Sequence, residues 1–168
     1  MLKRAHSILI IGISIFCISI QAYAADVLWR LTHEDQDALV IARITDYDES
    51  KYSAEVIHVI SGELNKKTIT INSEIKYWYL DIEAEIKEIC VLSLDESKSG
   101  YKIKWGAYKA TSEDYRTLKF VKNGLSEGIK ADLTAFEYYI NSNGKENDFY
   151  FEESTAYLRL ENGESIVI

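Results

Sequence analysis

Five short stretches of alternating apolar and polar residues lie close together between residues 38 and 110, and this spacing limits the folds open to the chain. The stretches span 38–46, 52–60, 68–71, 86–94 and 101–107. A period of two places alternate side chains on opposite faces of a β-strand. Most of the connections are short and polar, which favours antiparallel pairing. The pattern therefore predicts a mainly β fold, an antiparallel barrel or sandwich of five strands.

Two of these stretches depart from strict alternation. In 52–60, Ala54 and Val56 share one face whereas Ile57 and Val59 have the opposite parity. Either other parts of the chain cover both faces of the strand there, or a β-bulge shifts its register. The middle of 86–94 is apolar on both parities, which is typical of a central strand and places Cys90 in the core. We expect this cysteine to be unreactive, because no histidine or basic neighbourhood is evident around it.

Residues 111–168 have a different pattern. Residues 115–121 predict a further short strand. Residues 126–143 predict a helix, because Ile129, Leu133 and Phe136 recur on one stripe, with Ser126 as the N-cap. The Asn143-Gly144 pair is a stop signal for this helix.

Three apolar runs, 149–151, 157–160 and 166–168, predict strands at the C-terminal end. Asn162-Gly163 lies between the second and third runs and indicates a hairpin turn. Nearer the N-terminus, Thr32 with Asp35 three residues later predicts the cap of a short helical turn. The expected organisation is a barrel over 25–110 and a strand, helix and hairpin extension over 111–168 packed on it.

The first 24 residues have the pattern of a secretory signal peptide. Lys3 and Arg4 precede an apolar run over 7–20, and Ala22 and Ala24 put small residues before a cleavage site that follows Ala24. The run is shorter than the roughly 20 apolar residues of a membrane span, although a retained N-terminal anchor is the alternative. The sequence predicts a secreted or periplasmic protein, without a membrane span after cleavage.

Charge and composition exclude several classes of protein. Removal of the signal peptide leaves 17 basic and 27 acidic residues, so the net charge changes from −8 to −10. This acidic balance argues against nucleic acid as a partner. With 47% hydrophobic residues, the chain is not disordered, and its two cysteines are too few for a disulfide scaffold.

The strand segments resemble those of a known group. Residues 37–44 (DALVIARI) are similar to the opening strand of secreted bacterial OB-fold-like proteins, which are related in pattern to netrin and metalloproteinase-inhibitor domains. Residues 56–63 are similar to the end of that group's second strand, and 68–71 and 90–94 fall where its third and fourth strands lie. The resemblance implies a five-stranded OB-like antiparallel barrel with a C-terminal helix and β-hairpin extension. Many such bacterial proteins have no assigned activity.

This chain departs from that group at several positions. Ala42 stands where the group has glycine, Ser61 stands where it has lysine, and the glycine expected before the fourth strand is absent. The N-terminal cysteine that animal inhibitor domains use against metalloproteases is also absent. The resemblance therefore implies a fold, but neither inhibition of metalloproteases nor any site residue.

Histidines offer the only starting point for an enzymatic site. Beyond the signal peptide these are His33 and His58, and the HExxH zinc motif fails because Asp37 stands where its second histidine is needed. No cofactor, metal or catalytic residue is predicted. A small secreted hydrolase or metal-dependent enzyme that uses His33 or His58 is the alternative function.

Three consecutive aromatic residues, Tyr77, Trp78 and Tyr79, form the most distinctive segment. They cannot all point inward on a strand. Exposed aromatic side chains bind sugars, peptides and proteins, whereas a covering helix or hairpin would make them core residues. We predict a non-catalytic binding or interaction module whose partner is a protein or a neutral or basic ligand at the cell envelope. An accessory subunit with a permanent aromatic interface is a further alternative.

Overall fold

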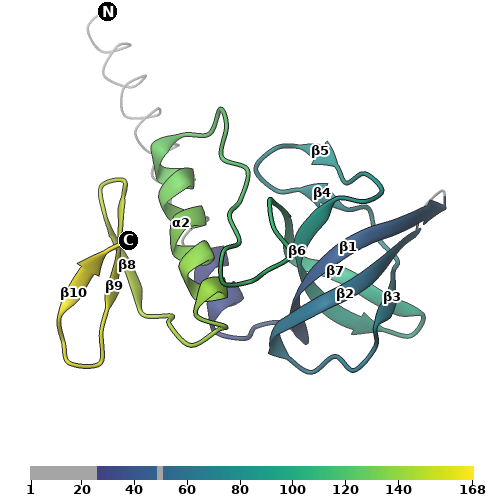
Figure 1. The fold of residues 1–168 in the computed structure, drawn as a ribbon, viewed down its shortest axis with the longest axis horizontal. Coiled ribbons are helices and arrows are strands. Elements are labelled where there is room, and N and C mark those ends of the chain that lie inside the picture. Colours follow the sequence, from purple (N-terminus) through teal and green to yellow (C-terminus); the bar gives the residue numbers. More distant parts are fainter. Residues whose placement is uncertain (1–25, 49–50) are drawn as a thin grey trace, which may run out of the picture.

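The computed structural model describes residues 26–48 and 51–168. The chain is mainly β, with one large sheet, a C-terminal helix and a small C-terminal sheet (Figure 1). The predicted signal peptide and its cleavage site lie outside the described residues. In the described ranges, no helix is both long enough and apolar enough to cross a bilayer.

The large sheet contains the five predicted strands and two short ones that the pattern missed. In spatial order it consists of β3 (Thr68–Ile71), β2 (Lys51–Gly62), β1 (Ala38–Asp48), β6 (Ile89–Ser97), β7 (Gly100–Ala110), β4 (Lys76–Tyr77) and β5 (Ile82–Glu83). The long strands pair antiparallel, as predicted. Two parallel pairings also occur, between β4 and β7 and, at Ile71 and Tyr101, between β3 and β7.

The pairing of β1 with β2 explains the broken alternation in 52–60. Its register shifts at three places along the ladder, and the last pair before the chain leaves β2 joins Ala38 to Gly62. The bulge that the sequence suggested is therefore confirmed. Gly62 has φ +79°, and a Cβ there would lie 2.1 Å from the Asp37 carbonyl oxygen. Only glycine fits this bend.

Residues 38–42 of β1 are buried on both faces of the sheet because this part of the strand separates two hydrophobic clusters. One cluster lies on the face that carries Ala42 and Cys90. The other contains Leu39 and Ile41 and extends to Phe136 of the C-terminal helix. Cys90 is buried as predicted, with its Sγ 3.6 Å from the Ala42 carbonyl oxygen, and burial raises the pKa of its thiol.

The C-terminal helix, α2 (Glu127–Asn141), begins and ends where the sequence indicates. The Ser126 hydroxyl accepts a hydrogen bond from the Ile129 amide, which makes Ser126 the N-cap. After the helix, Asn143 and Gly144 have φ values of +58° and +76°, the left-handed conformation that ends helices. The predicted cap and stop are both confirmed.

A small antiparallel sheet follows α2. It consists of β8 (Phe149–Glu152), β9 (Thr155–Arg159) and β10 (Ser165–Val167), with Asn162-Gly163 in the predicted hairpin turn. Ala156 of β9 belongs to the hydrophobic cluster that contains Phe136 of α2, and Leu158 of β9 is also buried. Figure 1 shows this sheet beside α2, on the side away from the large sheet.

The predicted strand over 115–121 is wrong. The only strand-type pairing recorded there is a single bridge between Ala110 and Phe120. The Phe120 amide instead donates to the Glu137 side chain at 2.6 Å, so a carboxylate on α2 replaces a neighbouring strand as its acceptor. Beside this bond, the Thr111 amide donates to the Lys119 carbonyl oxygen at 2.9 Å and the Val121 amide donates to the Lys109 carbonyl oxygen at 3.1 Å. The pairing with the end of β7 is therefore limited to this one bridge, and the Phe120 amide is satisfied by a side chain of α2.

The predicted helix start at Thr32 is also wrong. Residues 26–32 are helical, and the chain leaves the helix at residue 33. The Thr32 hydroxyl donates to the Leu28 carbonyl oxygen at 3.0 Å, and Glu34 has φ +59°. Leu28 and Leu31 are buried in the cluster that also contains residues of α2, so packing fixes the position of this helix. Thr32 lies at its C-terminal end and not at its start.

Candidate functional site

Tyr77, the first of the three predicted site aromatics, is a core residue. It lies in β4 with only 1% of its surface exposed. Its hydroxyl donates to Glu88 Oε2 at 2.8 Å, and Lys109 Nζ lies 5.7 Å from the centre of its ring. Burial is the main reason that the pKa of Tyr77 is raised.

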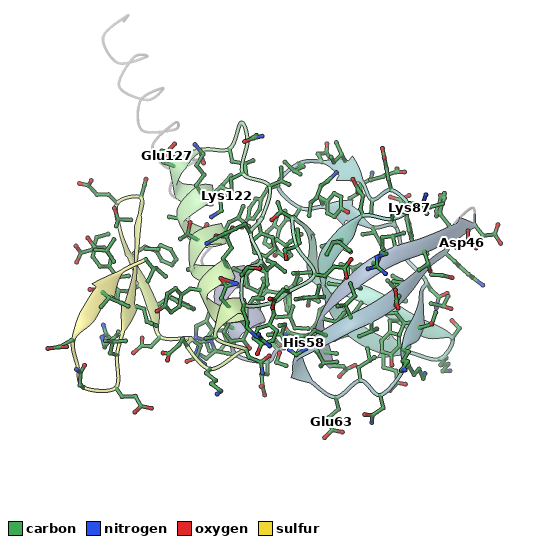
Figure 2. The ribbon with its side chains drawn as sticks, in the orientation of Figure 1. Asp46, His58, Glu63, Lys87, Lys122 and Glu127 are labelled. Carbon is green, nitrogen blue, oxygen red and sulfur yellow. The ribbon has the colours of Figure 1, made fainter. Side chains whose placement is uncertain are left out.

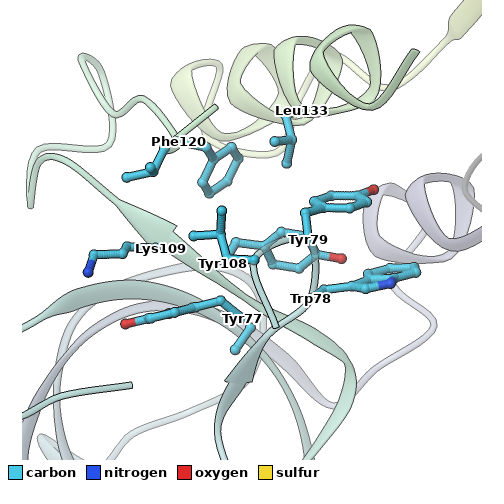
Figure 3. Close-up of a pocket in the computed structure, with 10 residues that line it drawn as sticks. Tyr77, Trp78, Tyr79, Tyr108, Lys109, Phe120 and Leu133 are labelled. Carbon is cyan, nitrogen blue, oxygen red and sulfur yellow. The ribbon is translucent and has the colours of Figure 1, made fainter. Parts of the chain in front are cut away.

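Trp78 and Tyr79 lie partly buried under α2. Their rings stack on each other, 5.2 Å apart and 6° from parallel, and each lies 6.1 Å from the ring of Tyr108. Figure 3 shows Leu133 of α2 above this group. Burial raises the pKa of Tyr79, and the nearby Asp132 raises it further. The structure thus brings the predicted aromatics together, with α2 covering part of them.

The hollow between these aromatic side chains is very small. Its volume is about 10 Å³. That is room for about one water molecule, whereas small-molecule sites usually enclose about 300 Å³ or more. These contacts match the packing interpretation of Trp78 and Tyr79 better than a preformed ligand site.

Truncation of Trp78 tests this packing. We expect Trp78→Ala to lower the free energy of unfolding by about 1–2 kcal/mol, less than for a fully buried tryptophan because part of the ring is exposed. Urea denaturation measures the effect. Trp29→Ala is the control, since Trp29 is largely exposed, and we expect a change within about 0.5 kcal/mol. Equal stability of the two variants would contradict the packing role.

A larger hollow opens on the other side of β4. It has a volume of about 610 Å³ and lies between residues 76–88 and the paired strands β1 and β2. We call it the hairpin groove, after the β4–β5 hairpin in its wall. Its lining includes the side chains of Tyr47, Tyr52, Ile82, Glu83, Glu85 and Glu88.

The hairpin groove combines apolar and acidic surface. Ile82 is 47% exposed, and the rings of Tyr47 and Tyr52 lie 4.5 Å apart. Within residues 26–48 and 51–168, no ion pair is recorded for the carboxylates of Glu83 and Glu85 or for that of Asp81, which also lines the groove. With Glu88, these groups place four carboxylates in the lining of the groove against two lysines, Lys76 and Lys109, so the groove is acidic on balance.

Glu88 is the most constrained carboxylate of the hairpin groove. It accepts hydrogen bonds from the Tyr77 hydroxyl and, at 3.0 Å, from the Glu85 amide, and it forms an ion pair with Lys109. Partial burial opposes ionisation, but these donors outweigh it and lower the pKa of Glu88. Glu88 is therefore ionised at neutral pH.

The two candidate histidines, His33 and His58, have separate structural surroundings. His33 Nδ1 lies 2.9 Å from the Trp29 carbonyl oxygen, and the two rings stack. His58 lies where β2 meets the end of α2 (Figure 2), with Nε2 2.7 Å from Asn143 Oδ1 and its ring stacked on Tyr115. Among the residues that the structure describes, no three His, Cys, Asp or Glu side chains are grouped to hold a metal ion.

Sequence reasoning did not identify the hairpin groove. Residues 80–86 (LDIEAEI) carry the alternation of acidic and apolar side chains that forms one wall. That alternation was the available signal, but the opposite wall comes from Tyr47 and Tyr52, some thirty residues earlier. Comparison of the chain with protein-family models, curated proteins and solved structures gave no match.

Proposed function

We propose that this protein is an exported, non-catalytic binding module of the cell envelope, and that the hairpin groove binds a basic and apolar segment of a partner protein. Export rests on the signal-peptide pattern of residues 1–24. The observation that carries the binding proposal is the exposed Ile82 between the carboxylates of Asp81 and Glu83, in a groove of about 610 Å³ whose lining has more carboxylates than lysines.

The chemistry of the groove supports one kind of occupant. Exposed Ile82 and the paired rings of Tyr47 and Tyr52 offer apolar contact area. The carboxylates of Glu83 and Glu85 favour arginine or lysine and repel anionic segments. The net charge of −10 after signal removal adds long-range attraction for a cationic partner.

We also propose that β1, β2, β3, β6 and β7 form a closed OB-like barrel, with residues 111–168 as an extension packed on it. Closure is supported by the parallel pairing of Ile71 with Tyr101 and by the hydrogen bond from the Asn72 amide to the Tyr101 carbonyl oxygen, 2.7 Å long. The packing of the extension is supported by the cluster that joins Leu39 and Ile41 to Phe136. In such a barrel the hairpin groove lies beside the segment that connects the third and fourth barrel strands.

Peptide binding tests the proposed function. The probe is a ten-residue peptide of alternating arginine and leucine, and its counterpart has citrulline in place of arginine. We expect the arginine peptide to bind the purified protein in calorimetric titration. Binding of the citrulline peptide should be at least tenfold weaker, because the loss of several charged contacts costs about 1.4 kcal/mol or more of binding free energy in total.

A matched pair of variants separates the groove from general charge attraction. Ile82→Ser removes the exposed apolar group of the groove without changing charge, and we expect it to weaken binding several-fold. Val167→Ser is the control, because Val167 is 66% exposed in β10, outside the groove. Equal affinities of the two variants would contradict binding in the hairpin groove.

A further inference from the structure

We propose that Glu88 and the ring of Tyr77 form a binding site for an ammonium or guanidinium group, and that Lys109 of the protein itself occupies this site until a partner cation replaces it. The proposal rests on the proposed function, since it assigns a specific contact within the hairpin groove. In this proposal, Lys109 competes with the cationic group of the ligand for the Glu88 carboxylate and the Tyr77 ring.

The geometry around Glu88 is that of a prepared cation site. The Tyr77 hydroxyl and the Glu85 amide both donate to Glu88 Oε2, which fixes the orientation of the carboxylate. Lys109 Nζ pairs with the other oxygen, Oε1. The same Nζ lies 5.7 Å from the centre of the Tyr77 ring, within range of a cation–π contact.

The pair is accessible enough for exchange. The side chain of Glu88 is 17% exposed and that of Lys109 is 29% exposed, and both line the hairpin groove. Removing Lys109 alone would leave the largely buried Glu88 carboxylate unpaired, which is costly, but a partner cation that replaces Lys109 keeps this carboxylate paired. A guanidinium can bind a carboxylate through two parallel hydrogen bonds and stack on an aromatic ring, which a lysine ammonium does less well.

The groove contains a second lysine that provides an internal comparison. Lys76 also lines the groove, but its ion pair is with Glu74, at 3.5 Å. Replacement of either lysine by methionine removes one positive charge and keeps a long side chain. General electrostatics therefore predicts the same gain in affinity for a cationic peptide, whereas competition at Glu88 predicts a larger gain for Lys109→Met.

The experiment measures the affinity of the arginine–leucine peptide for the wild-type protein, Lys109→Met and Lys76→Met. We expect Lys109→Met to bind about tenfold more tightly than Lys76→Met, because one charge-assisted contact becomes available to the ligand. Adding Glu88→Gln to Lys109→Met should abolish this gain. Thermal unfolding of each variant checks that the fold is retained.

The outcomes distinguish this inference from the function on which it rests. Peptide binding by Lys109→Met, without binding by the wild-type protein or Lys76→Met, would support the inference that Lys109 blocks the site. Peptide binding that Ile82→Ser weakens, with equal affinities for Lys109→Met and Lys76→Met, would overturn the inference and leave the binding module intact. Failure of the wild-type protein and both lysine variants to bind would overturn both proposals.

Discussion

Replacing Glu137 with alanine is expected to lower the free energy of unfolding by about 3–5 kcal/mol. Glu137 is 2% exposed and lies on the face of α2 that contacts residues 119–122. Its carboxylate accepts the Phe120 amide at 2.6 Å and pairs with Lys122 at 2.8 Å and Lys119 at 3.4 Å (Figure 2 shows Lys122 beside the helix). Alanine would leave the buried Phe120 amide and the Lys122 ammonium without this acceptor.

Chemical denaturation of a short series of variants measures this effect. Glu137→Gln keeps an acceptor for the Phe120 amide but loses the charge, so its cost should be smaller than that of Glu137→Ala. Glu127→Ala is the control, because Glu127 is exposed at the start of the same helix and, within the part of the chain that the structure describes, forms an ion pair with Lys130 alone. We expect this control to change stability by less than about 0.5 kcal/mol. If the free energy of unfolding of Glu137→Ala lay within about 1 kcal/mol of the wild-type value, which is about the value of one ordinary hydrogen bond, the role of Glu137 as the buried partner of Phe120 and Lys122 would be contradicted.

Replacing Asp132 with asparagine is expected to stabilise the protein at neutral pH. Burial raises the pKa of Asp132 from an ordinary 3.8 to about 6, so the folded state favours the protonated form. The stability that this proton contributes is fully present below about pH 4 and is lost as the pH rises to about 6. Above that range, ionised Asp132 costs about 1–3 kcal/mol. Asparagine avoids this cost because it carries no charge.

Thermal or urea unfolding at two pH values tests the role of Asp132. We expect Asp132→Asn to be more stable than wild type at pH 7.5, and most of the difference to disappear at pH 4. Glu161→Gln changes an exposed acid in the β9–β10 turn and serves as the control, with little change at either pH. A gain for Asp132→Asn that is the same at both pH values would show that ionisation is not its cause.

Local signals predicted most of the secondary structure because local chemistry determines it. The alternation in 68–71 corresponds to β3, and the Ser126 cap and the Asn143-Gly144 stop bracket α2. Residues 115–121 were predicted as a strand, but they form a single bridge to Ala110, and the Phe120 amide bonds to Glu137 of α2, which a local pattern does not include. Long-range side-chain contacts are the part of the fold that sequence patterns omit.

The candidate site was less predictable than the fold. The aromatic triplet was predicted as a binding site, whereas Tyr77 is buried in the core and Trp78 and Tyr79 pack against Tyr108. The hairpin groove needs surfaces from β1, β2 and residues 76–88 at once. Its walls are distant in sequence, so spacing alone could not bring them together.

The central claim, that the hairpin groove binds basic and apolar segments, is tested most directly by methyl NMR of the protein during titration with the arginine–leucine peptide. The account predicts that the signals of Ile82 move progressively and saturate, because Ile82 lies exposed in the groove, while those of Val167 in β10 stay in place. Saturating changes at Val167 with Ile82 unmoved, or no saturable change at either residue, would contradict it.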